Sequence, residues 1–331
     1  EDSEWCVWQR IYDDLKLGFK FNYGLLGEWS PNSGTYNINH AAYTGQSGLQ
    51  GFVYGVFYRL FNGNISPVIY YWLTSGAFVL CMFIILWWLY NEFGIVSSIA
   101  AYGILFFNQW LTVAARNMYW VIFTLVLPLV VTLTLLVVEE KKGLINTKLL
   151  YVFSFVTIFM KAACGFEFIS LAMINLELPL FYYAIKSKWS VSKFLKRFVG
   201  NGMAAMTAFF LAIILCVFQV KYYTNSSLMQ ALKIWGGHVT YRISGLADIN
   251  NYSGIVRESL MASKIEVIIK YLNEGTPLIF GMRMSILLIL CLLGMVCCLV
   301  SKDFCLKIET NRNKLLALCA LLIISITGPL S

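Results

Sequence analysis

The chain has 331 residues, of which 59% are hydrophobic and 13% are charged, and its formal net charge is +8. Its mean hydropathy is +0.70. A soluble domain is nearer half apolar and about one quarter charged, so this composition argues against a soluble globular protein and indicates a chain that crosses a membrane several times. Lys and Arg stand in short clusters between apolar stretches, which is typical of topology signals, and no nucleic-acid partner is expected.

The chain opens on EDSEWCVWQR without a Met and stops within the apolar run ISITGPLS, so we expect it to be part of a longer protein. From Trp5 to Phe21, apolar residues recur at helical spacing, with Gln9, Arg10 and further charged residues opposite them. This stretch is too short and too charged to span a bilayer. It predicts a helix that lies in the interface plane, with its tryptophans at headgroup depth.

A second interfacial helix is predicted over residues 48–63, with Phe52, Phe57 and Leu60 near one face. The segment between the two helices, GEWSPNSGTYNINHAAYTGQSG, is polar and rich in turn residues. We interpret it as a loop over a cavity.

Seven stretches are long enough, or nearly so, to cross a bilayer at about 20 residues each, and an eighth begins near residue 315. We therefore predict an all-α polytopic membrane protein with about eight transmembrane helices. ACGFE is the expected turn between the fourth and fifth spans. The predicted spans are 67–90, 96–114, 118–138, 149–165, 166–186, 200–220 and 282–301.

The basic residues predict how the chain is oriented. They gather in the segments 139–148, 186–197 and 301–314, which the positive-inside rule places in the cytoplasm. Residues 1–65 and 221–281 then form two extracytoplasmic loops, which flank a transmembrane bundle at 66–220, and 282–331 holds further spans. The expected location is an inner, plasma or ER-type membrane. Three N-x-S/T sequons, at Asn64, Asn225 and Asn251, fall on the outer side.

The acidic pair Glu1 and Asp2 is the first candidate for chemistry. A carboxylate at the mouth of a membrane cavity can accept the proton of an attacking hydroxyl. Two adjacent acids on a helix cannot both point at one atom, so at most one is the base. The other is a candidate for binding an acceptor or a divalent cation. Alternatively, both acids are solvated at a helix end.

Arg116 lies in TVAARNMYW, in a short outer turn. Its planar guanidinium is suited to gripping a phosphate at the membrane surface. The alternative is an interfacial arginine that extends its charged group into water and binds no phosphate. Arg242, Arg257 and Arg283 lie on the same predicted side and are alternatives for this role.

The remaining ionisable candidates are scattered. Glu167 lies near an outer turn, where it either contacts a substrate or pairs with Lys161. His40 and His238 are the two histidines and both lie in the outer loops. The aromatic and polar composition of the second outer loop suits sugar contact or an ordinary structured loop. The nine cysteines and two histidines show no metal-ligand spacing, so no metal site is predicted. Glu177 lies near the bilayer middle, where a charge costs at least about 3 kcal/mol.

Several of these stretches together resemble a known family. An acidic pair opens the first outer loop, an interfacial helix and a polar loop follow, and YTGQSGLQGFVYGVFYRLF leads into the membrane spans. This order, with ARNMYW and CGFEFISLAMINLELPLFYY, resembles the GT-C superfamily of integral-membrane glycosyltransferases. The resemblance covers the whole chain in architecture and is specific around 1–61 and 114–120.

The resemblance implies an enzyme that takes a sugar from a polyprenyl-phosphate carrier on the outer face. Its acceptor would be a glycan, a lipid or a protein, and membrane lipids would surround it. Asp2 would be the base, Glu1 the second choice, and Arg116 a contact to the carrier's phosphate. The chain lacks the helix that precedes the acidic pair in that family, and the family's C-terminal part. A secondary transporter or lipid flippase that uses Glu177 is the alternative, with Pro128 and Pro179 inside spans as its faint support.

Overall fold

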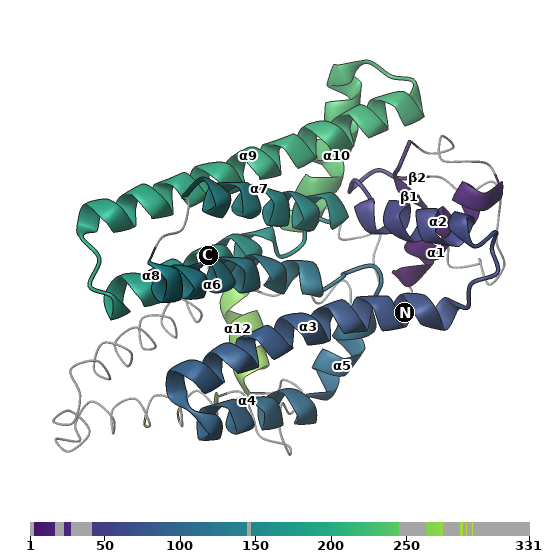
Figure 1. Cartoon of the computed structure of the whole chain (residues 1–331). Helices are drawn as coiled ribbons and strands as arrows, with labels where there is room; N and C mark the ends of the chain where they lie inside the picture. The colour runs from purple at the N-terminus through teal and green to yellow at the C-terminus, as the bar shows by residue number, and fades with distance from the viewer. Residues whose placement is uncertain are drawn as a thin grey trace, which may run out of the picture.

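The computed structural model describes residues 3–16, 23–27, 42–143, 147–244 and 263–273, with the single positions 285, 286, 289 and 293. Almost all of this part is helical, which confirms the predicted all-α class (Figure 1). The helices and strands, in chain order, are α1 Glu4–Lys16, β1 Leu26–Gly27, β2 Ala42–Tyr43, α2 Leu49–Leu60, α3 Pro67–Phe93, α4 Ile95–Phe107, α5 Gln109–Arg116, α6 Phe123–Lys142, α7 Thr147–Cys164, α8 Ile169–Lys186, α9 Val191–Thr224, α10 Leu228–Ser244 and α12 Lys264–Asn273.

Four helices of the described part, α3, α6, α7 and α9, are long and apolar enough to cross a membrane. They run side by side with α8 in Figure 1, and the closest packing is between α7 and α9 and between α6 and α8. The protein is therefore an integral membrane protein by the length and composition of its helices. The predicted spans at 282–301 and beyond 315 lie outside the described residues, and the total of eight stays a prediction.

The predicted span at 96–114 is two helices in the structure. Gly94, at φ 84°, turns the chain back after α3, and α4 then runs along α3, where the Ser98 hydroxyl donates to the Leu86 carbonyl at 3.0 Å. Asn108 ends α4 with an extended backbone, and its side chain accepts from the Leu111 amide at 3.1 Å. That bond is an N-cap, which begins α5 as a separate helix.

A small cap covers one end of the bundle. We define the cap as α1, α2 and the β1–β2 pair, in which Leu26 lies opposite Tyr43 and Gly27 opposite Ala42. α1 packs on both α2 and β1. The predicted helix at 48–63 is present as α2, and its apolar residues Phe52, Phe57 and Leu60 are exposed. Its position in the membrane interface stays a prediction.

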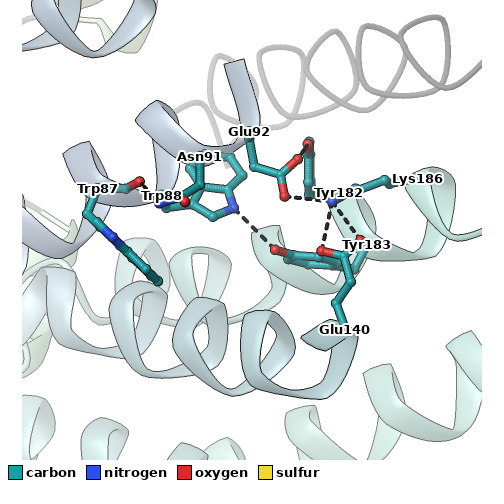
Figure 2. A network of polar contacts seen from close by, with 8 residues as sticks. All are labelled: Trp87, Trp88, Asn91, Glu92, Glu140, Tyr182, Tyr183 and Lys186. Carbon is teal, nitrogen blue, oxygen red and sulfur yellow. Dashed lines mark hydrogen bonds and ion pairs between the residues drawn. The ribbon is translucent and has the colours of Figure 1, made fainter. Parts of the chain in front are cut away.

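The two ends of the bundle differ in character, and we call them the cap end and the far end. At the far end, the Lys186 ammonium lies between the carboxylates of Glu92, at 2.6 Å, and Glu140, at 2.7 Å (Figure 2). The Tyr182 hydroxyl donates to Glu92 at 3.0 Å, and the Trp88 indole donates to the Tyr183 hydroxyl at 3.2 Å. These contacts fasten α8 to the ends of α3 and α6.

A second ion pair fastens α9 at the far end. Arg197 makes a bidentate contact with Glu139, at 2.7 and 2.8 Å, and its guanidinium lies over the Trp189 ring. The basic segments 139–148 and 186–197 thus meet at the same end, opposite the cap. The segment 301–314 lies outside the described residues, and the side of the membrane that each end faces stays a prediction.

Candidate functional site

Buried polar side chains dock the cap on the bundle. One oxygen of the Glu4 carboxylate accepts from the Met118 amide at 3.0 Å, and the other accepts from the Tyr71 hydroxyl at 3.4 Å. The Gln50 side chain donates to the carbonyls of Tyr119 and Cys164, at 3.1 and 2.8 Å. The two cap helices therefore hold the turn after α5 and the end of α7 in fixed positions.

α2 is also tied to α3. The hydroxyls of Tyr54 and Thr74 are 2.6 Å apart and form a buried hydrogen bond. Burial raises the pKa of Tyr54 to about 12, because the site disfavours a phenolate. The neutral phenol is therefore part of the docked cap.

The strand region of the cap binds the last turns of α9. The Gln219 amide donates to the carbonyls of Tyr23 and Ser47, at 3.0 and 3.2 Å, and its oxygen accepts from the Ser47 hydroxyl at 2.6 Å. The Ala42 amide donates to the Tyr223 hydroxyl at 2.8 Å. Segments far apart in the sequence thus share one polar junction.

A cavity of about 350 Å³ lies at this junction, between the cap, α7 and α9. We call it the Arg10 cavity; its walls include Arg10, Tyr23, Ser47, Phe52 and Gln219. Arg10 is 0% exposed, whereas Tyr23 and Phe52 are 47% and 43% exposed, so the two aromatic rings lie where the cavity meets the surface. Among the described residues that line the cavity, Arg10 is the one charged side chain.

Charged side chains also lie at the turn between α7 and α8. Glu167 accepts from the Tyr119 hydroxyl at 3.3 Å, and the buried Lys161 ammonium donates to the Gly165 carbonyl at 3.2 Å. A Cβ at Gly165 would lie 2.7 Å from a Glu167 oxygen and 2.8 Å from the Gln46 oxygen. The glycine therefore lets Glu167 approach Gln46 of the first loop, and the predicted turn at ACGFE is confirmed at 165–168.

Arg116 is exposed at the end of α5, beside an apolar groove. The groove has a volume of about 360 Å³ and lies between α3, α4 and α5; residues along its walls are Phe78, Phe83, Tyr102, Leu111 and Ala115. Arg116 follows Ala115 in the chain and is not among the described residues that line the groove. Because the helical stretch is interrupted at Asn108, α5 is a helix separate from α4.

The structure locates only part of the predicted site. Glu1, Asp2, His40 and Arg283 lie outside the described residues, and Arg242 lies in α10 with its side chain outside them.

Besides Arg116 and Glu167, two further predicted residues are placed with their side chains. His238, on α10, is half-buried, and its ring meets the Tyr43 ring edge-on at 5.9 Å, which places α10 against the cap. Glu177, on α8, has both carboxylate oxygens buried without a hydrogen-bond partner in the described part of the chain.

The prediction for α1 is wrong at two positions. Gln9 and Arg10 were assigned to the polar face, yet both are buried, while Trp5 is 39% exposed. The reason is that α1 has protein on several sides, whereas the periodicity argument assumes one apolar face.

The buried residues Glu4, Arg10 and Gln50 and the half-buried Gln219 were not identified from the sequence as candidates for the site. One signal existed. GFVYG in α2 places Gly51 and Gly55 one turn apart, and such small residues let another helix approach closely.

Within the described residues, no three His, Cys, Asp or Glu side chains gather closely enough to hold a metal ion. The chain matches no protein-family model, and no curated protein or solved structure is significantly similar to it. Its function is therefore argued from the site alone.

Proposed function

We propose that this protein is a membrane glycosyltransferase that moves a sugar from a polyprenyl-phosphate carrier to a glycan, lipid or protein acceptor at the cap end, on the extracytoplasmic side. The observation that carries the proposal is that the protein combines an apolar groove between α3, α4 and α5, an exposed arginine at the end of α5, and a cavity beneath the cap whose walls include polar side chains. A lipid-linked sugar likewise has an apolar tail, a phosphate and a hydroxylated ring.

The donor would bind with its tail in the groove between α3, α4 and α5. The walls there are almost entirely apolar and aromatic, and they suit isoprenoid units. Arg116 would bind the phosphate, because a guanidinium presents several donors to phosphate oxygens. Glu4 contributes indirectly, because its bond to the Met118 amide fixes the turn that follows Arg116.

The chemistry assigned to Asp2 is general-base catalysis. The acceptor's hydroxyl oxygen attacks the anomeric carbon while the bond from that carbon to the phosphate oxygen breaks. The hydroxyl proton passes to Asp2, and the carrier leaves as polyprenyl phosphate. Attack opposite the leaving group inverts the anomeric centre. Glu1 is the second choice for the base and the candidate ligand if a divalent cation takes part.

The test is transfer of labelled sugar from a panel of polyprenyl-phosphate donors by membranes that contain the full-length protein. Asp2→Asn should lower the rate at least about 100-fold, as loss of a general base does. Arg116→Gln should weaken donor binding at least about tenfold, from the loss of a charge-assisted contact. Arg59→Gln, on the exposed side of α2, is the control and should transfer normally. Full activity of Asp2→Asn and Glu1→Gln would contradict the assigned base.

Glu177 supports a second candidate function, in which the protein moves a lipid or solute across the membrane. Its two buried oxygens without a partner in the described chain are unusual for a carboxyl group at this depth. Under this alternative, Glu177→Gln abolishes movement of substrate across proteoliposomes. Under the transferase proposal, the same variant retains transfer when expressed at the wild-type level.

A further inference from the structure

We infer that the far end of the bundle binds the headgroups of anionic phospholipids, through lysines at the start of α9 and at the end of α6. The inference begins with the balance of charge at this end. Three carboxylates of the described residues lie here, and each is held in an ion pair with Lys186 or Arg197; they are Glu92, Glu139 and Glu140. Further lysines of the same end are exposed and leave the surface positive; among them are Lys141, Lys142, Lys193 and Lys196.

α9 is longer than a membrane crossing requires. Its 34 residues extend over about 50 Å, whereas the hydrocarbon core of a bilayer is about 30 Å thick. The apolar stretch at 200–220 accounts for the crossing, so residues 191–199 remain at the far end. We expect these first turns of α9 to lie at the depth of the lipid headgroups.

The first turns of α9 present an apolar face and a basic face side by side. At about 100° per residue, Val191, Leu195 and Val199 fall on one side of the helix, and all three are exposed. Lys193 and Lys196 lie on the adjoining face and are exposed as well. This pattern is typical of a helix segment in the membrane interface, where the apolar face meets acyl chains and the basic face meets phosphates.

Two tryptophans hold lysines at this end. The Lys193 ammonium lies 4.6 Å from the centre of the Trp189 ring, and the Lys141 ammonium lies 5.0 Å from the centre of the Trp87 ring. Figure 2 shows the Trp87 ring pointing away from the ion pairs of the far end. Because tryptophan prefers the headgroup region of a bilayer, we expect both ammonium groups to stand at the level of the lipid phosphates.

The partner that this surface fits is a phospholipid whose headgroup has a net negative charge. A zwitterionic headgroup has a cationic group that lysines repel, whereas an anionic headgroup offers its phosphate without one. The Lys193 charge is available to it, because Glu139 is 3.5 Å away and is already held by Arg197 at 2.7 Å. Each basic residue near an anionic lipid surface adds to the attraction. The inference does not depend on the proposed function, since it concerns the end of the bundle opposite the cap.

The experiment compares how two spin-labelled lipids associate with the full-length protein in phosphatidylcholine bilayers. Electron paramagnetic resonance measures the fraction of each lipid whose motion the protein restricts. We expect spin-labelled phosphatidylglycerol to associate at least about threefold more strongly than spin-labelled phosphatidylcholine at low salt. Salt at about 1 M should reduce this preference, because it screens charges beyond a few ångströms.

Paired variants locate the preference on α9. Lys193→Gln combined with Lys196→Gln should lower it at least about twofold, since two basic residues near the lipid surface are lost. Lys193→Arg combined with Lys196→Arg should keep it, because arginine retains the charge. Arg59→Gln combined with Lys233→Gln removes the same charge from exposed positions of α2 and α10, and this control should leave the preference unchanged.

The wild-type protein alone already tests the inference. Equal association of the two lipids at low salt would overturn it, and so would a preference that high salt leaves unchanged. Among the variants, a preference that persists undiminished when both α9 lysines are replaced by glutamine would overturn it. An equal loss in the control variant would do the same, because the lipid would then bind outside the far end.

Discussion

At the scale of single residues, the buried polar side chains at the cap end hold the cap on the helix bundle. Gln50 shows this most clearly, because its amide spans from α2 to the carbonyls of Tyr119 and Cys164. Both carbonyls are hydrogen-bonded by a side chain from another segment. A buried carbonyl that loses its partner costs about 1–3 kcal/mol.

Gln50→Leu should therefore destabilise the cap by about 2–4 kcal/mol, since two carbonyls lose their donor while the shape of the side chain is retained. The measurement is the melting temperature of the purified protein, together with its rate of limited proteolysis in the cap. Phe57→Leu, at an exposed position of the same helix, is the control. Equal melting temperatures for wild type and Gln50→Leu would contradict the role given to Gln50.

Tyr54 makes the cap sensitive to alkaline pH. Its pKa is raised from 10.0 to about 12, so the folded cap favours the neutral phenol. The stability that this contributes is complete below pH 10 and is lost as the pH rises through the folded pKa of about 12. We expect the Tyr54 phenolate to appear near pH 12 in an absorbance titration, after the exposed tyrosines. Tyr54→Phe should remove that late step, and a step that persists would belong to another tyrosine.

At the scale of elements, the packing of α1 on α2 positions the site. A Cβ at Gly51 would lie 2.6 Å from the Leu26 side chain and 2.8 Å from the Cγ of Arg10. The absence of a side chain at this position is what lets α1 carry Arg10 against α2.

Gly51→Ala should accordingly push α1 from α2 and destabilise the cap by about 1–3 kcal/mol, the usual cost of overpacking. Gly76→Ala is a matched control in α3, because a Cβ there meets nothing within 4 Å. The control should be neutral or stabilising by up to about 1 kcal/mol, since alanine favours helix over glycine. Thermal unfolding of both variants checks this, and equal stability of the two would refute the close approach.

The elements differ in how far the sequence predicts them. The long apolar runs at 67–90 and 118–138 predict α3 and α6, because a bilayer span needs little beyond length and hydropathy. The end of α4 at Asn108 was missed, because an N-cap is one hydrogen bond and a hydropathy window averages over it. The residues of the candidate site were more difficult to predict from the sequence than the helices. Arg10 appeared as a surface residue because burial by α2 and β1 is a tertiary effect that one helix's periodicity does not contain.

At the scale of the whole molecule, the account requires the cap end and the far end to lie on opposite sides of the membrane. Exposed residues suitable for labelling exist at each end, namely Asn64 after α2 and Ser187 after α8. The basic segments at the far end predict that it is cytoplasmic.

Asn64→Cys should therefore react with a membrane-impermeant maleimide added to intact cells, and Ser187→Cys should react only after the membrane is opened. The four described native cysteines are buried, so labelling of the parent protein gives the background. The reverse pattern would place the cap in the cytoplasm and would remove the basis for a donor on the outer face. Labelling of both positions in intact cells would contradict the prediction that the helices between them span the bilayer.

The central claim is that the cap end breaks the bond between a sugar and a lipid phosphate. The most direct measurement follows the chemical fate of a doubly labelled polyprenyl-phosphate sugar in proteoliposomes supplied with acceptor. The account predicts that the sugar label moves to the acceptor while polyprenyl phosphate accumulates in equal amount, and that Asp2→Asn stops both. A carrier that keeps its sugar but changes leaflet would contradict the account and would make Glu177 and transport the explanation of this fold.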